Sequence, residues 1–135
     1  MKPMILFACI HNGGRSLAAK VLTEKYSRGA VEVRSAGSEP GLTLNSSVVE
    51  VLAEMGISTE GEVPTLLTSA NVEEADVVIT MGCGETCPIF PGKHYEDWQV
   101  LDPKGQDLEI IREIVQDIDQ RVQNLLIQLG IPVQL

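Results

Sequence analysis

The sequence has no apolar run of about 18 residues, the length needed to cross a bilayer. It also has no basic segment followed by an apolar stretch at its start, which argues against a secretion signal. Basic side chains are scarce, with 10 Lys and Arg against 19 Asp and Glu and a net charge of −9. Nucleic acids and anionic membranes repel such a surface, so neither is an expected partner. We therefore expect a cytoplasmic protein.

Repeats, linkers and low-complexity segments are also absent, so we expect one domain spanning residues 1–135. The spacing of apolar residues, together with residues typical of helix and strand ends, indicates that strands and helices alternate along the chain. Strands are predicted at 4–8, 31–37, 76–81 and 98–101, helices at 15–27, 46–55, 69–74 and 108–129, and a loop at 82–92. This alternation predicts an α/β fold, a doubly wound four-stranded parallel sheet flanked by helices.

The last predicted helix has apolar residues at alternating steps of three and four from Leu108 to Leu129. Such a stripe is typical of a helix that packs on a sheet. A heptad of this length can also pair with a second copy, so a monomer and a homodimer both stay open.

A tight turn is predicted at residues 9–16, where the first strand meets the first helix. The first amides of a helix are unpaired and carry the positive end of its dipole, so such a turn binds a tetrahedral oxyanion. Converging amides would hold Cys9 as a thiolate, which is the nucleophilic form of cysteine. The alternative interpretation is a buried cysteine beside an ordinary turn.

Other side chains in this turn fit oxyanion binding. Gly13 and Gly14 let the backbone curl so that its N–H groups point inward. Arg15 offers a planar fork that clamps two oxygens of a phosphate-like group. The Ser16 hydroxyl could donate to the thiolate, and the Asn12 amide could pin the loop. His11 is interpreted as a surface residue without a catalytic role.

Two further cysteines, Cys83 and Cys87, follow the third predicted strand. The carboxyl ends of parallel strands share one edge of a sheet, so Cys9 is expected nearby. A thiol that forms a covalent adduct needs a second thiol to release it, and a third can remove the resulting disulfide. Incidental loop thiols are one alternative. A zinc site is another, with Cys83, Cys87 and His94 as ligands and Cys9 or an acid as the fourth; we expect no metal.

Asp102, followed by Pro103, comes after the fourth predicted strand and is expected at the same sheet edge. An acid there could protonate an oxygen that leaves an adduct on Cys9. A turn-forming Asp-Pro is the alternative interpretation, and Asp97 is a weaker candidate for the acid.

These motifs together resemble the low-molecular-weight protein tyrosine phosphatase fold, and within it the arsenate reductases. The residues that carry the resemblance are Cys9, Asn12, Gly13, Arg15, Ser16, Ser35–Gly37, Thr80–Cys83, Cys87-Pro88 and Asp102-Pro103. The resemblance implies that Cys9 attacks arsenate, Arg15 clamps the oxyanion and Asp102 is the general acid. It also implies that Cys83 attacks the Cys9 adduct and that Cys87 resolves the disulfide, which thioredoxin then reduces. The loop residues that would bind the substrate are Asn12, Gly13, Gly14, Arg15 and Ser16, and no bound cofactor is expected.

Three departures from the family pattern bear on function. Gly14 stands where many members have a second loop cysteine, and Lys104-Gly105 stands where the phosphatases usually have aromatic residues. Cys83 and Cys87 lie closer together than the resolving cysteines of thioredoxin-linked reductases. Their spacing resembles actinobacterial relatives, some of which use a small thiol with a glutaredoxin-like partner. The alternatives are thus a mycothiol- and glutaredoxin-linked arsenate reductase or a tyrosine phosphatase.

Overall fold

The computed structural model describes residues 2–82 and 92–134, within which four strands form one parallel sheet. The strands are β1 (Met4–Cys9), β2 (Glu32–Gly37), β3 (Val77–Met81) and β4 (His94–Asp97), in the spatial order β2-β1-β3-β4. β1 lies in the interior of the sheet, and all six of its residues are buried. Its apolar sequence fits this place, because a strand covered on both faces needs no polar alternation.

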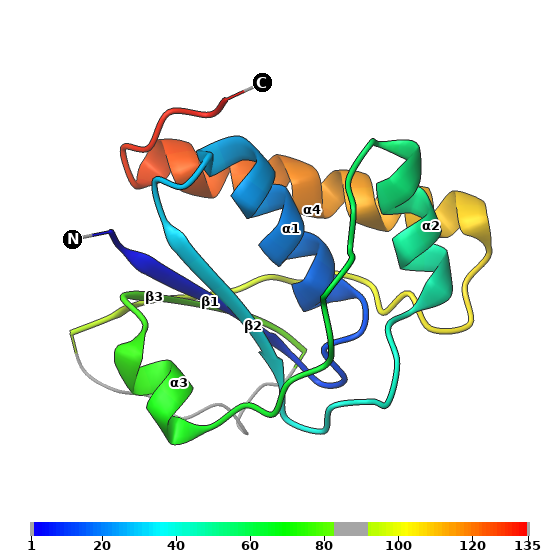
Figure 1. Cartoon of the computed structure of the whole chain (residues 1–135), viewed down its shortest axis with the longest axis horizontal. Helices are drawn as coiled ribbons and strands as arrows, with labels where there is room; N and C mark the ends of the chain where they lie inside the picture. The colour runs from blue at the N-terminus through cyan, green and yellow to red at the C-terminus, as the bar shows by residue number, and fades with distance from the viewer. Residues whose placement is uncertain (1, 83–91, 135) are drawn as a thin grey trace.

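Four helices flank the sheet: α1 (Arg15–Ser27), α2 (Ser46–Glu54), α3 (Ser69–Glu74) and α4 (Leu108–Gln128). Figure 1 shows α1, α2 and α4 on one face of the sheet and α3 on the other. Side chains alternate along β1 to match, since Ile5 and Phe7 join the core under α1 and α4 while Leu6 packs with Val72 of α3. The predicted doubly wound α/β fold is confirmed.

The helix boundaries follow local capping residues. α1 has its predicted bounds and ends at Arg28, which adopts the left-handed conformation at φ +46°. Asn45 and Thr68 cap α2 and α3, each accepting backbone N–H groups through its side-chain oxygen. Asp107 caps α4 in the same way. These ends are readable from sequence because each cap involves only neighbouring residues.

The predicted fourth strand at 98–101 is wrong, because β4 is the preceding polar segment His94–Asp97. β4 is an edge strand, and polar residues suit an edge that is partly exposed. Trp98 and Val100 are buried beyond the end of β4, where the last backbone bond to β3 runs from the Trp98 N–H to the Thr80 carbonyl oxygen at 2.8 Å. The Trp98 ring lies 5.7 Å from that of Phe7. Their apolar character therefore reflects packing in the core and not strand pairing.

The apolar stripe of α4 is buried within the chain. Its side chains join one hydrophobic core with residues of β1, α1 and α2. Those that are buried are Ile111, Ile114, Val115, Ile118, Val122, Leu125 and Leu126. Packing onto the rest of the domain, as predicted, accounts for the stripe. Among the described helices, none is both long and apolar enough to cross a membrane.

Candidate active site

Residues 9–16, here called the anion loop, connect the end of β1 to the start of α1. Cys9 is the last residue of β1, pairs with Gly37 and Met81 on either side, and is only 2% exposed. Its Sγ accepts the backbone N–H of Asn12 at 3.3 Å and lies 2.9 Å from Ser16 Oγ. The sulfur thus lies at the carboxyl edge of the sheet with two polar groups against it.

A chain of hydrogen bonds points toward this sulfur. Asn12 Nδ2 donates to Ser16 Oγ at 2.7 Å. Ser16 Oγ uses a lone pair for that bond, so its own hydrogen is free to point at Cys9 Sγ. A hydroxyl donor that faces the sulfur can hydrogen-bond to it, and such bonds are stronger when the acceptor is charged. These bonds place Asn12 and Ser16 beside the sulfur, and their roles in binding and reaction stay predictions.

Asn12 also fixes the loop to its surroundings. Its φ of +54° is left-handed, a conformation that asparagine tolerates better than most residues. The side chain is 1% exposed, and its Oδ1 accepts the backbone N–H of Thr65 at 2.8 Å. Thr65 in turn accepts the N–H of Gly37 at 2.8 Å. One buried asparagine therefore joins the anion loop to the end of β2 through the segment around Thr65.

An ion pair ties the same segment to α1. Lys20 Nζ lies 2.8 and 2.9 Å from the two carboxylate oxygens of Glu62. Burial acts to lower the pKa of Lys20, but the hydrogen bond to Glu62 and the charges of Glu24 and Glu62 raise it above its ordinary value. The ammonium stays charged, so the pair persists at neutral pH and supports the segment that holds Asn12.

Two glycines allow close contacts at the anion loop, one with backbone and one with a proline ring. A Cβ on Gly37 would lie 2.6 Å from the carbonyl oxygen of Ile10. A Cβ on Gly14 would lie 2.9 Å from Cγ of Pro103. The absence of a loop cysteine at position 14 thus goes together with close packing of the loop against Pro103. Pro103 directly follows Asp102, so this contact lies next to the predicted acid.

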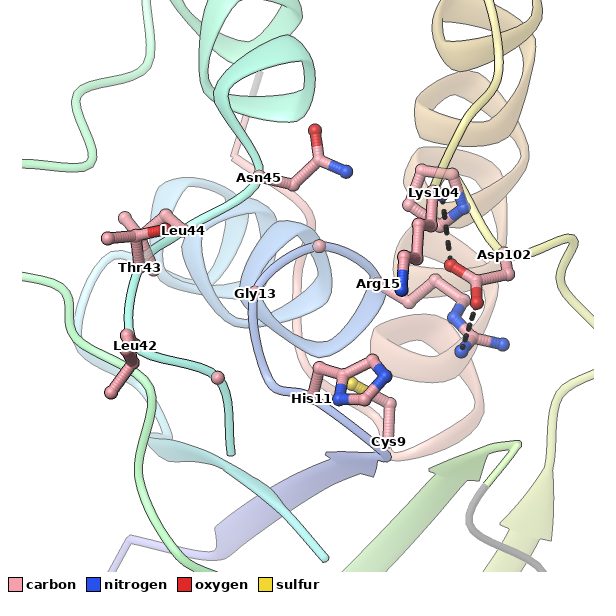
Figure 2. Close-up of a pocket in the computed structure, with 13 residues that line it drawn as sticks. Cys9, His11, Gly13, Arg15, Leu42, Thr43, Leu44, Asn45, Asp102 and Lys104 are labelled. Carbon is pink, nitrogen blue, oxygen red and sulfur yellow. Dashed lines mark hydrogen bonds and ion pairs between the residues drawn. The ribbon is translucent and has the colours of Figure 1, made fainter. Parts of the chain in front are cut away.

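Arg15 and Asp102 meet in the same pocket, although 87 positions separate them in the sequence. The Arg15 side chain is 9% exposed, its Nη1 donates to the carbonyl oxygen of Val100 at 3.3 Å, and its Nη2 lies 3.8 Å from Asp102 Oδ2. Asp102 is half-exposed and accepts the backbone N–H of Lys104 through Oδ1 at 3.0 Å. Figure 2 shows the carboxylate held between these two partners.

The pocket has a volume of about 390 Å³ and opens over the anion loop. Three parts of the chain line it, the anion loop, the stretch before α2 and the Asp102 loop. The residues are Cys9, His11, Gly13, Gly14, Arg15, Gly41, Leu42, Thr43, Leu44, Asn45, Asp102, Pro103 and Lys104. A cavity of this kind, with a sulfur, a guanidinium and a carboxyl group on its wall, suits a small tetrahedral anion that reacts with a thiol.

Several pocket residues were not predicted. His11, interpreted from sequence as a surface residue, lies in the pocket wall, with its Nδ1 3.1 Å from the carbonyl oxygen of Glu39. Leu42 is 99% exposed at the rim, and Lys104 lines the Asp102 side. No local pattern marks such residues, because the pocket forms only when residues 41–45 pack beside the anion loop. The backbone hydrogen bond from Asn45 to Gly13 at 2.7 Å holds that packing.

The remaining candidates are placed elsewhere or not described. Cys83 and Cys87 lie outside the described residues. His94 pairs with Val77 at the amino end of β3, about 13 Å from the Cys9 edge, since strands rise about 3.3 Å per residue. Residues 2–82 and 92–134 contain no group of three or more His, Cys, Asp or Glu that could hold a metal ion. Asp97 accepts a hydrogen bond from Thr80 Oγ1 at 2.6 Å and does not line the pocket.

A protein-family model described as low molecular weight phosphotyrosine protein phosphatase matches residues 4–134. The chain is 33% identical to a putative arsenate reductase of Halobacterium salinarum, over 88% of this chain and 87% of the relative. It is 30% identical to the glutaredoxin arsenate reductase of a Synechocystis species, over 93% and 98%. Both relatives are thus matched along most of their length.

Among solved structures, the thioredoxin-dependent arsenate reductase of Corynebacterium glutamicum superposes with a TM-score of 0.85 and 44% identity. The match covers 96% of this chain, and this chain spans 63% of the length of that protein.

Proposed function

The chain belongs to the low molecular weight phosphotyrosine protein phosphatase family, and we propose that it is an arsenate reductase that uses Cys9 as its nucleophile. Its similarity to two arsenate reductases supports the proposal. The observation that carries the proposal is the pocket in which Cys9 Sγ, Arg15 and Asp102 meet, in a chain with two more cysteines after β3. A phosphatase needs the first three groups but has no use for the other two thiols.

The first step forms a bond between sulfur and arsenic. The Cys9 thiolate attacks arsenate, whose charge is held by the loop amides and Arg15. One arsenate oxygen leaves as water after it takes a proton from Asp102, which therefore acts as general acid. Arsenic remains in the +5 state, so this step alone is the arsenic counterpart of phosphoryl transfer to cysteine.

The second step transfers two electrons. The Cys83 thiolate attacks Cys9 Sγ, a disulfide forms between the two sulfurs, and the bond from sulfur to arsenic breaks. Its electron pair stays on arsenic, which leaves as arsenite in the +3 state. Cys87 then attacks Cys83, the Cys9 thiolate is released, and a disulfide between Cys83 and Cys87 remains.

An external dithiol must reduce that last disulfide. Thioredoxin is our proposed donor, and the similarity to the thioredoxin-dependent reductase of Corynebacterium glutamicum supports it. The alternative is a reductase that uses a small thiol such as mycothiol with a glutaredoxin-like protein and needs neither Cys83 nor Cys87; the similar Synechocystis protein is a glutaredoxin arsenate reductase. Either donor places the reaction in the cytoplasm, where thiols are kept reduced.

A free-thiol count tests this proposal without any external reductant. Fully reduced protein is mixed with one addition of arsenate, quenched and unfolded, and its thiols are counted. Three thiols before and one after are expected. Inorganic phosphate is the matched control, because it has the shape and charge of arsenate but does not oxidise thiols. The Cys9→Ser variant starts with two thiols and should keep both after addition of either anion.

Two other results would favour the alternatives. All thiols remaining after arsenate, with rapid release of phosphate from an aryl phosphate, would support the phosphatase described by the family model. Unchanged steady turnover of Cys83→Ser with thioredoxin as sole donor would refute the cysteine relay. Turnover that requires a small thiol and survives loss of both Cys83 and Cys87 would identify the glutaredoxin-linked reductase.

A further inference from the structure

Lys104 is a pocket residue to which the proposed reaction assigns no task. Its backbone N–H donates to Asp102 Oδ1 at 3.0 Å, which fixes the base of its side chain beside the predicted acid. The side chain lines the pocket, and Figure 2 shows it extending from the Asp102 loop toward the anion loop. Within residues 2–82 and 92–134, no carboxylate forms an ion pair with its ammonium. An exposed cation therefore stands at an anion pocket without a partner in the described structure.

The charges on the pocket wall explain why this cation matters. Arg15 and Lys104 are the Lys and Arg side chains on the described pocket wall, and Asp102 and Cys9 are the two groups on it that carry negative charge when ionised. Arg15 lies 3.8 Å from Asp102, whose carboxylate offsets part of its charge when ionised. When Asp102 holds the proton that it gives as general acid, Arg15 balances only the Cys9 thiolate. The charge of Lys104 is then the one left on this wall for an incoming dianion.

The electrostatic field of the whole protein does not attract an anion to the pocket. The chain carries a net charge of −9, and that charge repels an oxyanion from the surface. Screening at physiological ionic strength limits such fields to about 8 Å, so charges on the pocket wall decide the affinity. Arg15 is buried beneath the opening, whereas Lys104 is exposed and reaches the anion first.

We propose that Lys104 binds the incoming inorganic oxyanion and sets the affinity of the pocket for doubly charged tetrahedral anions. The inference rests on the proposed function for its substrate, arsenate, but the recognition chemistry applies to any such anion. A lysine has three donors on a flexible stem, so it can follow the anion as it moves onto Cys9. Arsenite is released as uncharged arsenous acid at neutral pH, so the ammonium holds the substrate without holding the product.

Calorimetric titration of the reduced protein with inorganic phosphate tests the proposal directly. Lys104→Met, which keeps most of the length and removes the charge, should weaken phosphate binding about threefold to fivefold, as expected for one partly exposed charged contact. Lys104→Arg should bind within about twofold of the wild type. Lys2→Gln is the matched control, because it removes the same charge beyond the amino end of β1, at the opposite edge of the sheet from Cys9.

Steady-state arsenate reduction supplies a second readout. The KM for arsenate should rise in Lys104→Met by the same factor as the phosphate Kd, while kcat stays within about twofold. Added salt should raise KM less steeply in this variant than in the wild type, because one attractive charge has been removed. Urea unfolding of each variant checks that stability is unchanged.

The outcomes separate this inference from the proposed function. Wild-type phosphate affinity in Lys104→Met, or equal weakening in Lys2→Gln, would overturn the role of Lys104. Weaker phosphate binding in Lys104→Met, in a protein whose thiols do not react with arsenate, would leave the role of Lys104 intact and refute the reductase. Loss of kcat without a change in phosphate affinity would also overturn the inference, since it would place Lys104 in the chemical step.

Discussion

Replacing Asn12 tests whether the anion loop is held by one buried side chain. Asn12→Ala removes the donor to Ser16 Oγ and the acceptor of the Thr65 N–H, which lie at 2.7 and 2.8 Å. It also puts alanine at a left-handed φ of +54°. We expect both a less stable protein and a less reactive Cys9, because the same side chain fixes the loop and orients the hydroxyl that faces the sulfur.

The magnitude follows from the two bonds and the backbone. The buried bond to Ser16 contributes about 1–2 kcal/mol, and the partly buried bond to Thr65 about 1 kcal/mol. Left-handed alanine adds roughly 1 kcal/mol. The expected loss for Asn12→Ala is therefore about 3–4 kcal/mol. Asn12→Gly loses the same bonds without the backbone cost, so it should be about 1 kcal/mol more stable than Asn12→Ala.

Urea unfolding measures the stability, and the rate of arsenate-driven thiol loss measures the reactivity. The unfolding midpoint should fall without a change in the slope of free energy against urea. The rate of thiol loss should fall about tenfold, the equivalent of about 1.4 kcal/mol for a weakened hydrogen bond to the thiolate. A stability loss under about 0.5 kcal/mol would refute the structural role of Asn12. Equal stability of the Ala and Gly variants would refute the backbone contribution.

Three further predictions rest on other contacts. Gly37→Ala puts a Cβ 2.6 Å from a carbonyl oxygen of the anion loop, so urea unfolding should show a loss above about 2 kcal/mol, and unchanged stability would contradict the close approach. Gly14→Cys crowds Pro103, whose Cγ would lie 2.9 Å from the new Cβ, so kcat for arsenate should fall about tenfold in a folded protein, and a wild-type kcat would disprove the coupling. Burial, then a hydrogen bond and charge from a carboxylate of α4, raise the pKa of Tyr26 from 10.0 to about 12. The folded state therefore keeps a proton that the unfolded state releases, and stability should fall as pH rises from 10 to 12; the same slope in Tyr26→Phe would refute this origin.

Much of the fold could be predicted because its signals are local. The caps Asn45 and Thr68 act on backbone groups two or three residues away, so the starts of α2 and α3 can be read from sequence. β4 could not be placed, because its residues owe their strand conformation to pairing with β3 and not to their own polarity. The strand was predicted at 98–101 because those residues, beginning with Trp98, are more apolar. The Trp98 ring instead packs in the core against Phe7.

In the candidate site, too, the parts that are local in sequence could be predicted, and the parts brought together by folding could not. The anion loop is continuous in sequence and could be found there. Asp102 lies beside it as expected, but not for the reason given, because β4 ends at Asp97 and the non-strand residues 98–101 carry the chain to the pocket. The pocket wall at 41–45 depends on a backbone hydrogen bond between Asn45 and Gly13, which no periodicity reveals. Lys104 was noticed from sequence only as a departure from the family pattern, and its place on the wall emerged from the folded arrangement.

The place of Cys9 at the end of β1 has a consequence for hydrogen exchange. β1 is paired with a strand on each side along most of its length, and all of its residues are buried. Amides of such a strand exchange only when a large part of the protein opens, whereas the edge strand β4 can open locally. The Cys9 sulfur is therefore attached to the slowest-opening part of the sheet. Fraying at the edge strand should leave the proposed nucleophile in place, and loss of any reactivity of Cys9 on denaturation should coincide with global unfolding.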